Sequence, residues 1–152
     1  MGKFLLLSAV LIAMLSSVRA QQPDSTEPAK AEDTTTPTKT FKKETASSLT
    51  VEAKLCTSVV DRKAQGEAIK FGSEVGQVYL WCRVNGATDT THVEHLWYYK
   101  GEEKASIKLP VKAASWRTWS KKTIMPHWTG QWEVKIVDAD WHVLKTIAFT
   151  VE

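Results

Sequence analysis

The residues with the most distinctive chemistry lie in one stretch of the chain, from His95 to Trp132. It contains five of the seven tryptophans, together with His95, Arg117 and Ser120. An imidazole, a guanidinium and a hydroxyl above a tryptophan floor would make a small polar pocket for a ligand. A neutral histidine beside a tryptophan on a strand is equally typical of a hydrogen-bonding residue in a core. Both interpretations are open from the sequence alone.

The residue spacing matches no catalytic or metal-binding arrangement. Ser120 lacks the glycine-flanked elbow of a serine nucleophile, and His95 has no acid partner at a fixed spacing. His92 and His95 are three positions apart, which places them on opposite faces of a strand and makes them a poor ligand pair. Asp138 and Asp140 flank a turn and offer only weak cation ligands. We therefore predict a non-enzymatic protein with no metal and no other cofactor.

The tryptophans divide between a core and a candidate recognition face. Trp116 and Trp119 are three apart, so on a regular strand they point to opposite sides and one of them is exposed. An exposed tryptophan on a polar β surface often marks a contact site, because its rigid ring gives contact area at small entropic cost. We assign to the core Trp97, Trp116 and Trp132. The candidate binding residues are Trp81, Trp119, Trp128, Arg117, His95 and Ser120, with Trp141 as a further candidate for the same platform.

Arg117 lies between two tryptophans and has three possible roles. It can stack on an indole, clamp a carboxylate of a partner, or form a structural ion pair with Glu94 or Glu133.

Alternating apolar and polar residues predict the elements that carry these side chains. Period-two patterns begin at Leu49 and recur about every ten residues to Val151, without a convincing helix. Residues 61–76 contain three glycines and little periodicity, and they are predicted to form a long connection. Pro110 lacks an amide donor, so its strand belongs at a sheet edge or contains a break. The pattern predicts an all-β fold, an antiparallel, immunoglobulin-like β-sandwich of about seven strands. The expected strands are 49–59, 77–84, 93–100, 105–112, 116–124, 131–137 and 143–151.

Cys56 and Cys82 are the two cysteines. An even number in an oxidising compartment favours a disulfide, and the other interpretation is two buried free thiols. Cys82 shares a strand face with Leu80 and Val84, whereas Cys56 shares its face with polar residues, so a bridge requires one of them to leave its pattern. The sequence leaves both interpretations of the cysteines open.

The chain begins like an exported protein. A basic start, an apolar run of about twelve residues and small residues before Gln21 are typical of a signal peptide over residues 1–20. The run is shorter than the roughly 20 residues that span a bilayer, so we predict no transmembrane span in the mature form. Residues 21–48 read as a disordered linker rich in Thr, Pro, Lys and Glu, and 49–152 as the folded domain. Removal of the signal peptide with Lys3 and Arg19 lowers the formal charge from +3 to +1. A protein so close to neutral has no strong electrostatic field to attract nucleic acid, so we predict no nucleic-acid partner.

Four motifs together resemble one bacterial family, the domain of unknown function 2914. The resemblance covers roughly residues 53 to 152 and implies an exported or membrane-tethered protein with this domain at its C-terminus. It implies no known activity. One departure is Trp141, where the family tends to have glycine. The motifs are H-x-W-Y from His95, W-R-T-W-S-x-K from Trp116, G-x-W-x-V from Gly130 and D-x-D-x-x-V-L-x-x-x-x-F-x-V from Asp138.

These observations predict a periplasmic or secreted binding module of the cell envelope, whose partner is an envelope protein or a polysaccharide. One alternative is a carbohydrate-binding module that stacks sugar rings on exposed tryptophans. A second alternative is a structural spacer domain, which would expose no cluster of tryptophans.

Overall fold

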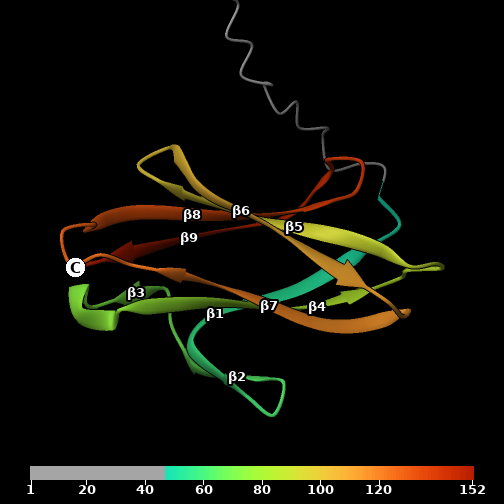
Figure 1. Ribbon diagram of the computed structural model, residues 1–152, viewed down its shortest axis with the longest axis horizontal. Helices are drawn as coiled ribbons and strands as arrows, with labels where there is room; N and C mark the ends of the chain where they lie inside the picture. Colours follow the sequence, from blue (N-terminus) through green and yellow to red (C-terminus); the bar gives the residue numbers. More distant parts are fainter. Residues whose placement is uncertain (1–46) are drawn as a thin grey trace, which may run out of the picture. The chain divides into compact units, whose positions relative to one another are not determined.

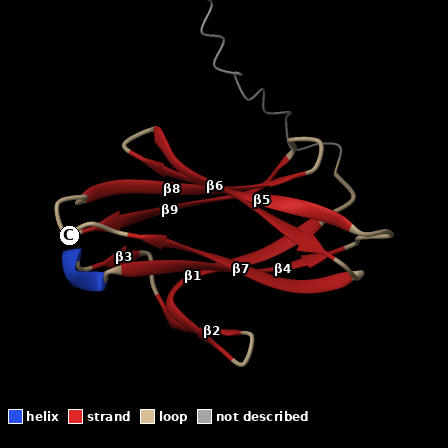
Figure 2. Ribbon diagram, in the orientation of Figure 1, coloured by secondary structure: helices blue, strands red, loops and turns tan. Residues whose placement is uncertain are grey.

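A computed structural model describes residues 47–152 of the chain. The predicted signal peptide, and the predicted linker apart from its last two residues, lie outside the described residues. The described part consists almost entirely of strands, which Figure 2 shows in red, and its one helical turn, η1 (Ser73–Val75), is drawn in blue. Within this part of the chain, no helix is long and apolar enough to cross a bilayer.

The strands form two layers that face each other, as Figure 1 shows. One sheet has the order β2-β1-β4-β7 and the other has the order β3-β9-β8-β5-β6. Their pairing is antiparallel except between β3 and β9. The strands are β1 (Thr50–Val60), β2 (Lys63–Glu67), β3 (Lys70–Phe71), β4 (Gln77–Asn85), β5 (Thr91–Tyr99), β6 (Glu102–Val111), β7 (Ser115–Thr123), β8 (Gly130–Asp138) and β9 (Val143–Val151).

The core lies between the two sheets and is built by the predicted alternation. On β4, Val78, Leu80, Cys82 and Val84 are buried on the inner face, as their spacing of two requires. Facing them from the other sheet are Trp97 of β5 and Trp132, Val134 and Ile136 of β8, all fully or almost fully buried. Trp116 is half-buried and packs against the edge of this core. The prediction of an all-β antiparallel sandwich is confirmed.

The number of strands differs from the prediction. Nine strands lie in the described residues rather than about seven, because β2 and β3 form within the segment expected to be a connection. The β1–β2 hairpin turns at Asp61 and Arg62, which both adopt positive φ, a conformation suited to a tight two-residue hairpin. Figure 1 shows this hairpin projecting from the lower layer, away from the other sheet. The hairpin forms one wall of the surface described below.

The two cysteines are free, so the possible disulfide is not formed. In the β1–β4 ladder Cys82 is paired with Ala53, and Cys56 is paired with Tyr79. The two sulfurs are therefore three ladder positions apart. Since successive side chains point to opposite faces of a sheet, Cys82 points into the core and Cys56 points to the outer face beneath the β1–β2 hairpin.

Candidate binding surface

His95 and Ser120 do not line a ligand pocket. His95 is 0% exposed and Ser120 is buried with it between the sheets. The Nδ1 atom of His95 lies 2.8 Å from Ser120 Oγ, and the indole N–H of Trp97 donates to the same oxygen at 3.2 Å. Arg117 is exposed on the opposite face of β7. The interpretation that these three residues share one polar pocket is therefore wrong, and the structural interpretation of His95 is correct.

The buried group is a closed hydrogen-bonded network across the two sheets. His95 Nε2 lies 3.4 Å from Cys82 Sγ, so both ring nitrogens have partners inside the core. Burial lowers the pKa of His95 to about 3, and burial raises the pKa of the Cys82 thiol to about 12. Both groups are therefore neutral near pH 7, when neither a cation nor a thiolate is available for chemistry. The network joins β7 to β5 and specifies how the sheets pack.

Trp81 was predicted to be an exposed platform residue, and this prediction is wrong. Its side chain points to the outer face of β4 but is only 5% exposed. The β1–β2 turn folds over the ring, and the indole N–H donates to the carbonyl of Arg62 at 2.9 Å. The guanidinium of Arg83 lies 5.9 Å from the ring centroid. Trp81 thus forms the floor of the surface and holds the hairpin against the sheet.

Trp119 is the tryptophan that the fold leaves open. It is 38% exposed and pairs directly with Trp81 in the β4–β7 ladder, so the two indoles lie side by side on the outer face. Its neighbours two positions away on the same face are Arg117 and Lys121, both exposed. An exposed apolar ring thus lies between two cations.

Arg117 lines two hollows, one on this face and one at the edge of β7. The first, of about 340 Å³, lies between the β1–β2 hairpin and the sheet, with Trp81 and Arg83 in its lining. The second, of about 390 Å³, is lined by Trp119, Trp116 and Thr118 of β7, by Pro110 of β6 and by Arg62. Among the described residues, Arg117 forms none of the predicted ion pairs with Glu94 or Glu133. Its guanidinium is therefore available to a carboxylate of a partner.

Trp128 belongs to a separate aromatic cluster and is half-buried. Its ring stacks on Tyr99 with 6.0 Å between centroids, and the ammonium of Lys122 lies 5.4 Å from the indole. The carbonyl of Trp128 accepts the indole N–H of Trp132 at 3.1 Å. These contacts show that Trp128 packs over the end of the core and does not belong to the outer face that carries Trp119.

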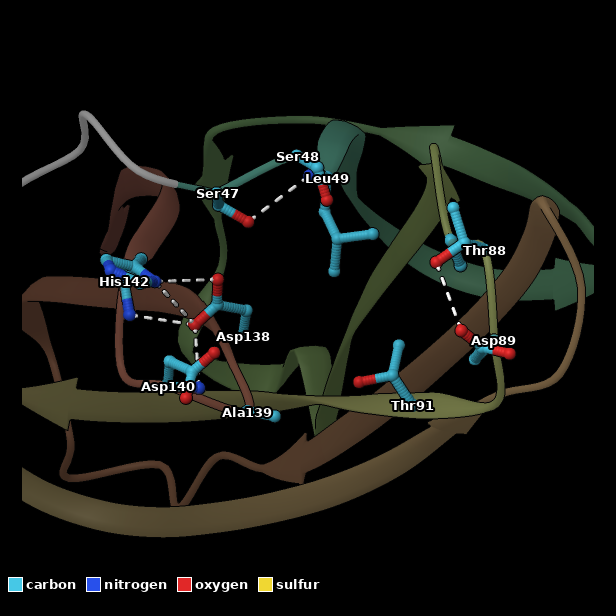
Figure 3. A pocket seen from close by; sticks show the side chains of 11 residues that line it. Ser47, Ser48, Leu49, Thr88, Asp89, Thr91, Asp138, Ala139, Asp140 and His142 are labelled. Atoms are coloured by element: carbon cyan, nitrogen blue, oxygen red, sulfur yellow. Dashed lines mark hydrogen bonds and ion pairs between the residues drawn. The ribbon is translucent and has the colours of Figure 1, made fainter.

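A second polar site lies where the β8–β9 turn meets Ser47, and Figure 3 shows it from close by. Asp138 Oδ1 accepts the backbone N–H groups of Asp140 and His142, each at 2.9 Å. The ring Nδ1 of His142 lies 3.0 Å from Asp138 Oδ2. One ligand atom from each of Asp138, Asp140 and His142 lies within 4.8 Å of the others. The sequence indicated Asp138 and Asp140, and it missed His142, whose signal was its position four residues after Asp138.

Hydrogen bonds within this turn already occupy the central carboxylate. Burial alone would raise the pKa of Asp138, but hydrogen bonds from Ser47, His142 and Asp140 outweigh burial and hold the pKa below its ordinary value. A cation at this place would compete with the N–H donors of the turn itself. The arrangement is explained by the turn, which requires Trp141 to adopt a φ of 64°. This positive φ gives the physical reason why glycine suits the position.

The geometry defines an all-β sandwich domain. The polar groups of the sites described above lie in the core, in the β8–β9 turn, or on the outer face of β4 and β7. Residues 90–151 match the family described as "Protein of unknown function (DUF2914)". This match supports membership of the chain in that family, as the motifs predicted. It starts later than the resemblance, which began near residue 53.

Other comparisons add little. No curated protein matches the chain. Two solved structures of a β-glucosidase from Listeria innocua, a mutant in complex with laminaribiose and an enzyme in complex with glucose, align at 10% and 11% identity with a TM-score of 0.39. The alignments cover 68% and 66% of this chain, which spans about 16% of the length of those enzymes. A likeness this slight supports no argument about activity.

Proposed function

We propose that this protein is an exported, non-enzymatic binding module of the cell envelope, and that it binds an acidic segment of a partner protein at the outer face of β7. The observation that carries this proposal is the exposed ring of Trp119 between Arg117 and Lys121. Neither cation has an ion-pair partner among the described side chains. A rigid aromatic ring flanked by unpaired cations suits an acidic ligand with an apolar group between its charges.

The burial of His95 and Ser120 supports the non-enzymatic part of the proposal. The histidine and serine with the best hydrogen-bonding geometry are enclosed in the core, and a general base must reach the proton that it abstracts. Export is supported by the basic and apolar start of the chain alone.

The carbohydrate alternative requires exposed rings in a row. Of the three tryptophans proposed for it, Trp81 is buried and Trp128 is half-buried beneath lysine, which leaves Trp119. The spacer alternative does not explain why a tryptophan is exposed beside an unpaired arginine. An acidic polypeptide fits the surface better than either.

The test uses polyglutamate as an acidic polypeptide, with polylysine and neutral glycan fragments of chitin as the other arms. We expect polyglutamate binding to shift the indole emission saturably. Added salt should weaken this binding, and the emission shift should be lost in Trp119→Ala and in Arg117→Ala. Lys108→Ala, an exposed position on β6, is the matched control and should behave as the wild type. A response to glycan fragments alone, or a polyglutamate response that neither β7 variant changes, would overturn the proposal.

A further inference from the structure

The free edge of β7 is the place where an extended chain can join this sandwich. β7 ends the order β2-β1-β4-β7, so only one of its sides is paired. It is nine residues long and contains no proline. The other edge strands among residues 47–152 are less suitable, since β6 is interrupted by Pro110, β2 contains Gly66 and β3 has two residues.

The ladder identifies which backbone groups lie on that free edge. The N–H of Gly86 donates to the carbonyl of Ala114, and the N–H of Ile124 donates to the carbonyl of Gly76. These bonds lie at both ends of the same continuous β4–β7 register. In an antiparallel pair, hydrogen-bonded residues alternate with residues whose groups point away from the partner. The backbone N–H and C=O of Arg117, Trp119 and Lys121 therefore point away from β4.

The same three residues carry exposed side chains at the centre of the outer face of β7. A strand that pairs with their backbone groups places every second side chain directly across from Arg117, Trp119 and Lys121. Opposite charges and apolar pairs are favourable at such cross-strand positions. A complementary partner strand therefore has an acidic residue, any residue, an apolar residue, any residue and an acidic residue at five successive positions.

Space is available beside the edge. The hollow of about 390 Å³ is lined by Arg117 and Trp119 from the outer face of β7 and by Trp116 and Thr118 from its inner face. A hollow that contacts both faces of an edge strand lies along its edge. Pro110 of β6 and Arg62 of the β1–β2 turn complete its lining, and the Arg62 guanidinium lies 5.7 Å from the ring centroid of Trp116.

A second copy of this chain is a poor occupant. Antiparallel self-pairing centred on Trp119 places Arg117 of each copy opposite Lys121 of the other, so two like-charge pairs face each other. Charges on an edge strand oppose self-association in this way. Protection against self-association requires only the charges, and it does not explain the exposed tryptophan between them.

We infer that β7 binds an extended acidic segment of a partner protein by antiparallel strand addition, with the pattern acidic, any, apolar, any, acidic across Lys121, Trp119 and Arg117. This inference rests on the proposed function, because it uses the same surface, and it names the mode of binding and the class of partner. The partner's backbone supplies affinity and its alternate side chains supply specificity.

The test uses a capped seven-residue peptide with aspartate at its second and sixth positions, leucine at its fourth and threonine elsewhere. In the inferred complex the N–H of the fourth residue donates to the carbonyl of Trp119, whereas the N–H of the fifth faces solvent. We expect N-methylation of the fourth residue to weaken binding about tenfold or more, and N-methylation of the fifth to change it less than about twofold. Amide hydrogen exchange at Arg117, Trp119 and Lys121 should slow when the unmethylated peptide is added to the full chain.

Two further arms separate the possible failures. A peptide with lysine in place of both aspartates should bind at least about tenfold more weakly. Equal effects of the two N-methyl groups, with binding still lost in Trp119→Ala, would overturn strand addition and leave the proposed function standing. Absence of peptide binding at about millimolar concentration, with binding of an acidic polysaccharide such as polygalacturonate, would overturn both.

Discussion

At the scale of single residues, the most informative side chains are those whose burial cannot be deduced from the face of the strand on which they lie or from their polarity. Trp81 and Trp119 are paired on the same outer face of the sheet, yet the first is a buried floor and the second is open to a ligand. His95 has the polarity of a functional residue and the surroundings of a core residue. Substitutions at these positions therefore separate structural roles from binding roles.

The stability of the domain should fall at acid pH because of His95. Its pKa is about 3 in the folded protein, against roughly 6.5 in an unfolded chain. Above pH 6.5 both states are neutral at this residue and pH has no effect through it. Below that pH the unfolded state binds a proton that the folded state does not, so unfolding becomes easier by up to about 1.4 kcal/mol per pH unit until pH approaches 3. Cys82, which contacts His95, stays protonated throughout this window because its pKa is about 12.

Urea denaturation between pH 7.5 and 4 measures this dependence. His95→Gln should lower stability at pH 7.5 by about 2 kcal/mol through lost hydrogen bonds and packing, and it should reduce the acid slope. His127→Gln, at an exposed position, should keep the wild-type slope. An unchanged slope in His95→Gln would show that other groups cause the acid sensitivity.

Trp81→Phe should destabilise the domain by about 1 kcal/mol. The phenyl ring keeps most of the apolar burial but loses the N–H that donates to the carbonyl of Arg62. The matched control is Trp119→Phe, the same change at the ladder partner, which should alter the free energy of unfolding by less than about 0.5 kcal/mol. Chemical denaturation measures both, and equal losses would contradict the assignment of Trp81 to the floor and Trp119 to the surface.

At the scale of elements, β7 has two different sides. Its inner side chains hold the sheets together, through Ser120 and through Trp116 at the edge of the core. Its outer side chains Arg117, Trp119 and Lys121 are exposed, and one of its two edges is unpaired. One strand therefore links the core to the proposed surface.

Hydrogen exchange along β7 should alternate residue by residue in the free protein. The amides of Arg117, Trp119 and Lys121 face the open edge and should exchange quickly, whereas those of Thr118 and Ser120 are bonded to β4 and should exchange slowly. Exchange measured by nuclear magnetic resonance gives the rates one amide at a time. Uniform protection along the strand would mean that the edge is already covered.

At the scale of the whole molecule, charge on the edge strand controls which strands can pair with it. Arg117 and Lys121 lie at equal distances along the strand on either side of Trp119, so antiparallel self-pairing centred on Trp119 forms the Arg117–Lys121 pair twice. The signs of these charges thus affect the oligomeric state of the molecule.

Arg117→Glu should promote dimers. The substitution converts both repulsive pairs across a β7–β7 edge into attractive ones, each worth roughly 0.2–1 kcal/mol at such positions. Analytical ultracentrifugation of wild type and variant over a range of concentrations measures the change. The double variant Arg117→Glu with Lys121→Glu restores like charges and should associate no more than the wild type. If the double variant dimerises as strongly as the single one, the charge argument fails.

Much of the fold was predictable from local patterns, and the surface was predictable only in part. Alternation located the strands of both layers and the core positions Trp97 and Trp132, because one buried face imposes a period of two. The β1–β2 hairpin escaped detection because Gly66 and the polar residues around it carry little periodicity. As a result, the cover over Trp81 could not be foreseen, whereas the opposite directions of Cys56 and Cys82 followed from the strand faces that the alternation assigned to them.

The sequence by itself determined the strand pattern, the family motifs and the presence of an exposed tryptophan on β7, since Trp116 and Trp119 cannot share a face of one strand. Only the tertiary structure decided which of them is exposed, that Ser120 meets His95 across the sandwich, and that β7 ends its sheet. The physical reason is that side-chain direction alternates locally along a strand, whereas burial depends on what distant segments place against each face and edge.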